Sequence, residues 1–167
     1  MTASWSAEKI ASLLRERFVS NNSPPTDPTI DVLITFDSCG VSSHLNHISL
    51  YHGARAFISS LTDGDSSESQ GPPIDLYALA SVNFFRKYTG MFDVFATLGS
   101  SGAFSSGGRA ANRPSSLVHI HGLGRGGWAT ARQAMTEAHV SQMRWFRYGW
   151  ITLSRYMYVN DLNLVEV

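Results

Sequence analysis

Closely spaced histidines are the residues of this sequence best suited to chemistry. His44, His47 and His52 lie within the stretch HLNHISLYH, and His119 and His121 form a second cluster. On a helix, His44 and His47 would share one face, so a shared metal is conceivable, whereas on a strand they would point to opposite faces. Neither cluster has a carboxylate or thiolate at ligand spacing. We therefore predict that the protein carries no stoichiometric zinc, iron or manganese, and no other cofactor.

Acid–base catalysis is the other use to which these side chains could be put. If the protein is an enzyme, the candidate residues are Asp37, His44, His47 and His119, since such chemistry needs groups that exchange protons near neutral pH. The enzyme would be small and cofactor-independent, of the cyclase, isomerase or dehydratase kind, with these side chains in a pocket. No GxSxG elbow and no P-loop occurs, so the sequence offers no motif for nucleophilic catalysis or phosphate binding.

The run MRWFRYGW near the C-terminus combines arginines with aromatic rings. These residue types bind the phosphates and stacked bases of single-stranded RNA. They also form protein interfaces, in which the aromatic residues are buried and the arginines lie at the rim. Both interpretations predict the same interface or RNA-binding residues, which are Arg144, Trp145, Arg147, Tyr148, Trp150, Arg155 and Tyr156.

The composition describes one globular domain. The 167 residues are 43% apolar and 16% charged, which suits a chain that buries a core. No apolar run approaches the roughly 20 residues that cross a bilayer, and no secretory leader opens the chain. We therefore expect a soluble, intracellular product without membrane contact. The single cysteine, Cys39, excludes an intramolecular disulfide.

Charge is divided unevenly along the chain, although the net charge is zero. Residues 1–75 carry four bases against nine acids, and residues 76–167 carry nine bases against four acids. Apart from chance segregation, such asymmetry favours head-to-tail contacts between copies or a basic surface for an anionic partner such as RNA. Because aromatic residues also gather near the C-terminus, we predict homo-oligomers that associate through residues 144–158.

The chain is predicted to be a single domain, residues 1–167, in three parts. Serine caps and apolar residues at helical spacing predict an amphipathic helix within residues 1–20. Prolines and polar residues predict a linker over residues 21–29, and residues 30–167 form a β-rich body.

Strand signals dominate the body. IDVLITF is rich in β-branched residues, MFDVFATL alternates, and the tail from residue 143 has the strongest strand signal. Residues 42–61 fit a helix or a pair of strands, and the expected loops are residues 63–73 and 99–116. These features predict a mainly β fold, an antiparallel sandwich or jelly roll preceded by one amphipathic helix. The alternative is an α+β cone-shaped fold in which helices cover a curved sheet.

Residues 74–164 resemble the capsid proteins of picorna-like viruses. The sequence carries an aromatic-Arg-x-x-x-Gly pattern followed by alternating apolar residues, here Phe85, Arg86, Gly90, Phe92, Val94 and Ala96, and the tail GWITLSRYMYVNDLNL is similar to the late strands of that jelly roll. The resemblance implies a capsid or virion-associated subunit that assembles with its own copies or with sibling capsid proteins. It further implies a location in the virion or host cytoplasm and no catalytic residues.

Overall fold

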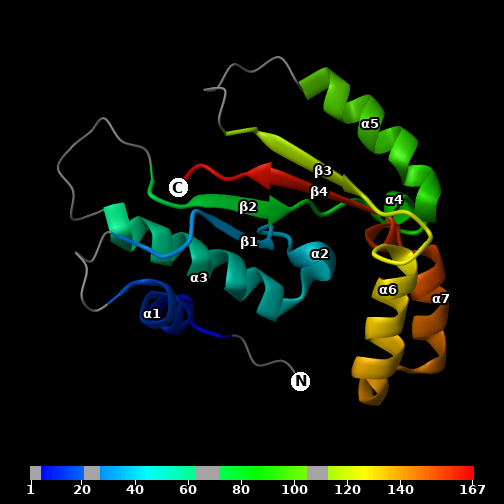
Figure 1. Cartoon of the computed structure of the whole chain (residues 1–167), viewed down its shortest axis with the longest axis horizontal. Coiled ribbons are helices and arrows are strands. Elements are labelled where there is room, and N and C mark those ends of the chain that lie inside the picture. The colour runs from blue at the N-terminus through cyan, green and yellow to red at the C-terminus, as the bar shows by residue number, and fades with distance from the viewer. Residues whose placement is uncertain (1–4, 21–26, 63–71, 105–112) are drawn as a thin grey trace. The chain divides into compact units, whose positions relative to one another are not determined.

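The computed structural model describes residues 5–20, 27–62, 72–104 and 113–167 (Figure 1). The chain forms two compact units, residues 1–81 with 163–167 and residues 82–162. About 55% of it is helical, and its strands make a small mixed sheet of four strands in the order β1-β2-β4-β3. The prediction of a mainly β sandwich or jelly roll is therefore wrong. None of the described helices is both long enough and apolar enough to cross a membrane.

The first unit contains a parallel strand pair and the helices that pack on it. Its elements are α1 (Ala7–Phe18), β1 (Val32–Phe36), α2 (Gly40–Ser43), α3 (Leu45–Thr62), β2 (Asp75–Leu79) and the end of β4 (Val159–Leu164). Helix α1 begins where the Ser6 hydroxyl accepts a hydrogen bond from the Lys9 N–H at 3.2 Å, which confirms the predicted N-terminal helix. Helix α1 packs on α3, and α3 packs on β1. The core of the unit consists of Ala54, Phe57, Ile58, Leu61, Ile74 and Leu76.

The parallel register places the ends of two strands side by side. Leu33 pairs with Leu76 and Phe36 pairs with Leu79, so β1 and β2 both finish at the same edge. The predicted strand IDVLITF is thereby confirmed, although its partner runs parallel to it. In parallel sheets, functional groups gather beyond the carboxyl ends of the strands. Most of the predicted linker, residues 21–26, and most of the loop at residues 63–73 lie outside the described residues.

The second unit is built mainly from short helices. Two strands, β3 (Ser116–Ile120) and the start of β4, accompany α4 (Phe84–Lys87), η1 (Gly90–Phe92), α5 (Asp93–Phe104), α6 (Trp128–Gln133), η2 (Ala134–Ala138), η3 (Val140–Gln142), α7 (Trp145–Leu153) and η4 (Arg155–Met157). Its core contains Ile151, Met157, Tyr158 and Val159.

Two segments predicted as strands are helices in this unit. Among the side chains described in α5, those of residues 93–100, the buried ones are Asp93 and Thr97, which are four residues apart; α7 buries Ile151. The aromatic and β-branched residues in both segments favour strands on propensity alone. Tertiary packing overrides this preference, because one buried face at helical spacing is sufficient to hold a helix.

The contact between α1 and α3 depends on Gly53. A Cβ atom at this position would lie 2.5 Å from the Ile10 Cβ, and it would overlap the Ile10 Cγ2. Because a Cβ atom cannot rotate away, we expect Gly53→Ala to lower the free energy of unfolding by about 1 to 3 kcal/mol. Urea unfolding of the purified chain would measure this loss.

Gly149→Ala is the matched control, since Gly149 lies inside α7. Apart from the adjoining backbone of that helix, no described atom lies within 4 Å of the position that an alanine methyl group would take there. Alanine has a higher helix propensity than glycine, so the free energy of unfolding of this variant should rise by about 0.5 to 1 kcal/mol. Equal effects at the two positions would contradict the close packing of α1 on α3.

Candidate functional site

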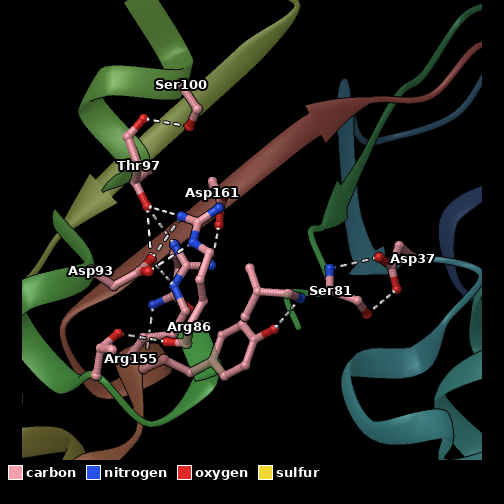
Figure 2. Close-up of polar contacts among 12 residues, drawn as sticks. Asp37, Ser81, Arg86, Asp93, Thr97, Ser100, Arg155 and Asp161 are labelled. Carbon is pink, nitrogen blue, oxygen red and sulfur yellow. Dashed lines mark hydrogen bonds and ion pairs between the residues drawn. The ribbon is translucent and has the colours of Figure 1, made fainter. Parts of the chain in front are cut away.

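The Asp37 carboxylate joins the ends of β1 and β2. Its Oδ1 atom accepts hydrogen bonds from the Cys39 N–H at 3.1 Å, the Gly40 N–H at 2.9 Å and the Ser81 hydroxyl at 2.6 Å. Its Oδ2 atom accepts one from the Ser81 N–H at 2.6 Å (Figure 2). Asp37 follows β1 directly and Ser81 follows β2, so the carboxylate ties together two strand ends and the loop that leaves one of them. Both carboxylate oxygens therefore have a structural role at this junction.

The loop after Asp37 adopts a backbone that side chains normally avoid. Gly40, Val41 and Ser43 have φ values of 61°, 63° and 57°. Glycine adopts positive φ without strain, but a β-branched residue such as Val41 at positive φ is an outlier, and strain of this kind costs on the order of 1 to 3 kcal/mol at a non-glycine position. The Val41 N–H donates to the Ser81 hydroxyl at 2.8 Å, so Ser81 holds the strained residue from outside the loop. Strain held in this way is typical of functional sites.

His47 is oriented by the same loop. Its Nδ1 atom lies 3.1 Å from the Gly40 carbonyl oxygen, and its ring stacks on Phe36 with centroids 3.8 Å apart. A carbonyl oxygen only accepts hydrogen bonds, so Nδ1 carries the proton and donates it. The lone pair of a neutral ring is then on Nε2. Such a nitrogen can accept a proton or bind a ligand.

His44 lies next to His47, with ring centroids 5.1 Å apart. Three of the four residues predicted as an acid–base set are thus close together, because Asp37 and His47 both contact Gly40 and His44 contacts His47. His119 is on β3 in the second unit, where its ring contacts that of His121. Two imidazoles supply only part of a zinc site, and within the described ranges no three His, Cys, Asp or Glu side chains form a group that could hold a metal. The prediction of no stoichiometric metal stays a prediction.

A second polar cluster lies in the second unit, and it is buried. Arg155 is fully buried, its Nε atom is 2.6 Å from Asp93 Oδ2 without being aligned for a hydrogen bond, and its Nη1 atom donates to Asp161 at 2.8 Å. Arg86 donates to both oxygens of Asp93, and Thr97 bonds to both arginines and to Asp93 (Figure 2). This ionic network of Arg86, Asp93, Thr97, Arg155 and Asp161 holds α4, α5, η4 and β4 together.

The network changes the proton affinities of its members. Burial alone would raise the pKa of Asp93, but the hydrogen bond from Arg86, the charge of Arg155 and the hydrogen bond from Thr97 together lower it below its ordinary value. The hydrogen bond to Asp93 raises the pKa of Arg86 against the effect of burial. Burial lowers the pKa of Lys87, which follows Arg86 in α4 and is not part of the network. Arg86 and Asp93 are therefore charged at neutral pH, and each carboxylate of the network is paired with an arginine.

The residues predicted as an interface or RNA-binding surface do not form one exposed surface, because some of them are exposed and others are buried. Trp145 and Tyr148 are exposed on α7, whereas Arg155 is buried in the ionic network and the Tyr156 hydroxyl accepts a hydrogen bond from the Val82 N–H at 3.3 Å. The remaining members are exposed Arg144, half-buried Arg147 and half-buried Trp150. Their binding role stays a prediction.

Sequence reasoning missed two members of the site, Gly40 and Ser81. Gly40 provides both the N–H that meets Asp37 and the carbonyl that meets His47. A side chain at Gly40 would also meet Ile48 Cγ1 at 2.9 Å. The glycine after DSC is a usable signal for a turn, but nothing in the run ALASV distinguishes Ser81 from an ordinary strand-end serine.

Comparison with known proteins points to a class of enzymes. A protein from Arthroderma benhamiae named N-acetylglucosaminyl-phosphatidylinositol de-N-acetylase is 41% identical, over 97% of this chain and 56% of the relative. A probable enzyme of the same name from Schizosaccharomyces pombe is 35% identical over 97% of this chain and 54% of its own length, and the Saccharomyces cerevisiae protein is 27% identical over 96% and 54%. The chain thus spans about half the length of the curated relatives it matches. No protein-family model matches it, and no solved structure matches it.

These relatives correct several predictions made from the sequence. They are named as de-N-acetylases, so the resemblance to capsid proteins is wrong, and with it the interpretation as a self-assembling structural protein of an RNA virus. Homo-oligomers and sibling capsid proteins are equally wrong as the expected partners. The enzyme alternative is closer, although removal of an acetyl group differs in kind from cyclase, isomerase or dehydratase chemistry.

Replacing Asp37 by asparagine should unfold the strand-end junction. Donors face both carboxylate oxygens, so either orientation of the new amide places its NH₂ group against a backbone N–H. We expect Asp37→Asn to lower the free energy of unfolding by about 2 to 3 kcal/mol in urea titrations. Asp31→Asn is the same change at an exposed position just before β1, and it should alter the free energy of unfolding by no more than about 0.5 kcal/mol. Two equal losses would mean that Asp37 does not hold the junction.

Asp93 should make stability depend on acid pH. Because its pKa is lower in the folded than in the unfolded protein, its contribution is complete above the unfolded value of about 4 and is lost as the pH falls through the folded value. Asp93→Asn should therefore lower the free energy of unfolding by about 3 kcal/mol at pH 7. The difference in this free energy between the variant and the unchanged protein should become smaller below about pH 4. Unfolding titrations across this pH range test the trend.

Glu137→Gln is the control for Asp93→Asn, since Glu137 is exposed and bonds only to Gln133 among the contacts described for it. This variant should leave the free energy of unfolding nearly unchanged at every pH. A difference for Asp93→Asn that stays constant from pH 7 to pH 2 would contradict the lowered pKa.

Proposed function

We propose that this chain forms part of an N-acetylglucosaminyl-phosphatidylinositol de-N-acetylase, an enzyme that hydrolyses the acetamide of a sugar attached to a phospholipid. The observation that carries the proposal is the arrangement of Asp37, Gly40 and His47 at the carboxyl ends of parallel strands, in a segment that aligns with relatives of this name. Nearly half of each relative's length has no counterpart in this chain. We therefore propose that the residues described here supply one part of the active site of such an enzyme.

Amide hydrolysis needs a group that moves a proton. The oxygen of a water molecule adds to the acetyl carbon while a base takes its proton, and the C–N bond then breaks as the nitrogen is protonated, releasing acetate and a free amine. Imidazole is the side chain most often used for both transfers. His47 presents Nε2 for this purpose because its Nδ1 proton is donated to Gly40. In this proposal His47 accepts and returns the proton, His44 lies beside the reacting group, and Asp37 acts as a positioning residue.

A chimera tests the proposal. The matching segment of the Arthroderma benhamiae protein would be replaced by this chain, and release of acetate from N-acetylglucosaminyl-phosphatidylinositol would be measured. We expect the chimera to be active and His47→Ala to lower its rate at least 100-fold, since a positioned acid–base group contributes about 10²- to 10⁴-fold.

The matched control is His52→Ala. His52 is exposed on the same helix, and its ring contacts Tyr51, with centroids 5.3 Å apart. Its removal should change the rate less than twofold. A folded chimera without activity, or equal rates for the two histidine variants, would defeat the proposal.

A further inference from the structure

An apolar face covers one side of the second unit. Met91, Phe92, Phe95, Ile120 and Leu123 form it, contributed by η1, α5, β3 and the loop that follows β3. These side chains flank a hollow of about 390 Å³, whose lining also includes Val94, His121, Gly122 and Tyr158. They are far from buried, since Phe92 is 72% exposed and Phe95 76% exposed. Contiguous exposed apolar side chains of this size mark a surface that binds something.

The helix at this face has its polar and apolar sides reversed. Asp93 and Thr97 are 2% and 1% exposed and point into the ionic network. Phe95 comes from the opposite side of α5, and Phe92 is the last residue of η1, directly before α5; both side chains are exposed. A helix on the surface of a water-soluble domain normally buries its apolar stripe and exposes its polar side. The reversal is understandable if the medium or partner outside the face is apolar.

The charge of the second unit limits what this partner can be. Residues 82–162 contain nine bases and three acids. The ionic network takes two of the bases, Arg86 and Arg155, and two of the acids, Asp93 and Asp161, which leaves seven bases against one acid. Arg125, exposed two residues after Leu123, places positive charge close to the apolar face. Aromatic and aliphatic side chains bordered by basic residues are typical of surfaces that bind anionic bilayers.

We propose that this apolar face docks on the surface of a phospholipid bilayer that contains anionic lipids. Phe92, Phe95 and Leu123 enter the boundary between headgroups and acyl chains, and the basic residues of the unit meet the lipid phosphates. The choice of a lipid surface over a protein partner rests on the proposed function, in which the substrate is itself attached to a phospholipid. The expectation of no membrane contact considered only segments that cross a bilayer, whereas a docking face needs none.

Flotation of the full chain with vesicles tests the docking. The vesicles are phosphatidylcholine alone or phosphatidylcholine with phosphatidylinositol. We expect the chain to float with the mixed vesicles, severalfold less with phosphatidylcholine alone, and less at raised salt. The double substitution Phe92→Ser and Phe95→Ser should reduce flotation with mixed vesicles about tenfold or more.

The control is Phe146→Ser, which removes a 52% exposed aromatic residue of the same unit from outside the hollow. It should float like the unchanged chain, and circular dichroism should show all variants folded. The proposal fails if the unchanged chain does not float with either vesicle, or if the double variant floats equally well. It also fails if light scattering shows that the face instead joins copies of the chain.

The test of membrane docking can be distinguished from the test of the proposed enzyme activity. The chimera can be assayed on N-acetylglucosaminyl-inositol phosphate without acyl chains, which needs no membrane. Hydrolysis of this soluble compound together with absent flotation would overturn the docking alone. Flotation that depends on Phe92 and Phe95, together with an inactive chimera, would overturn the enzyme assignment alone.

Discussion

The Asp37 carboxylate is the group on which the geometry of the candidate site depends. It receives donors from both sides, the N–H and hydroxyl of Ser81 after β2 and the N–H groups of Cys39 and Gly40 in the loop after β1. These bonds compensate for the strain of positive φ at Val41, a conformation that valine by itself disfavours. The constrained loop then aims the Gly40 carbonyl at His47. A single carboxylate thus determines, through backbone atoms, which nitrogen of a histidine is available.

The second unit uses buried charge for a different purpose. Arg155 and Asp93 are almost without solvent contact, and each would be costly to bury alone. With Arg86, Thr97 and Asp161 they satisfy one another, so charged groups serve as the interior of α5. Because Asp93 and Thr97 point into the network, Phe95 on the opposite side of α5 is left facing outward. The ionic network thus accounts for the position of one member of the apolar face.

Physical reasons explain which features could be predicted from the sequence. The helix after Ser6 and the strand IDVLITF were predictable because each has a local pattern, a cap with apolar periodicity in one case and β-branched residues in the other. The predicted acid–base group was Asp37, His44, His47 and His119, chosen by residue type; the first three are neighbours in the sequence and in the structure, whereas His119 lies on β3 of the second unit. Ser81 was not predictable, because its role comes from a parallel pairing with a strand about 40 residues earlier. The aromatic content of α5 and α7 predicts strands, but both segments are helices. In α5 the buried side chains include Asp93 and Thr97, which no hydrophobicity pattern marks as interior. The same aromatic segments gave rise to the erroneous capsid resemblance.

The protonation of His47 tests the link between Asp37 and the candidate catalytic nitrogen most directly. Long-range ¹H–¹⁵N correlation spectra of the chain, labelled in histidine and recorded at alkaline pH, distinguish the two ring nitrogens by their shifts. We predict that His47 is protonated at Nδ1 in the unchanged chain, and that Asp37→Asn gives a mixture of the two neutral forms because the Gly40 carbonyl is released. A His47 ring protonated at Nε2, or one whose spectrum is the same in both proteins, would contradict this account.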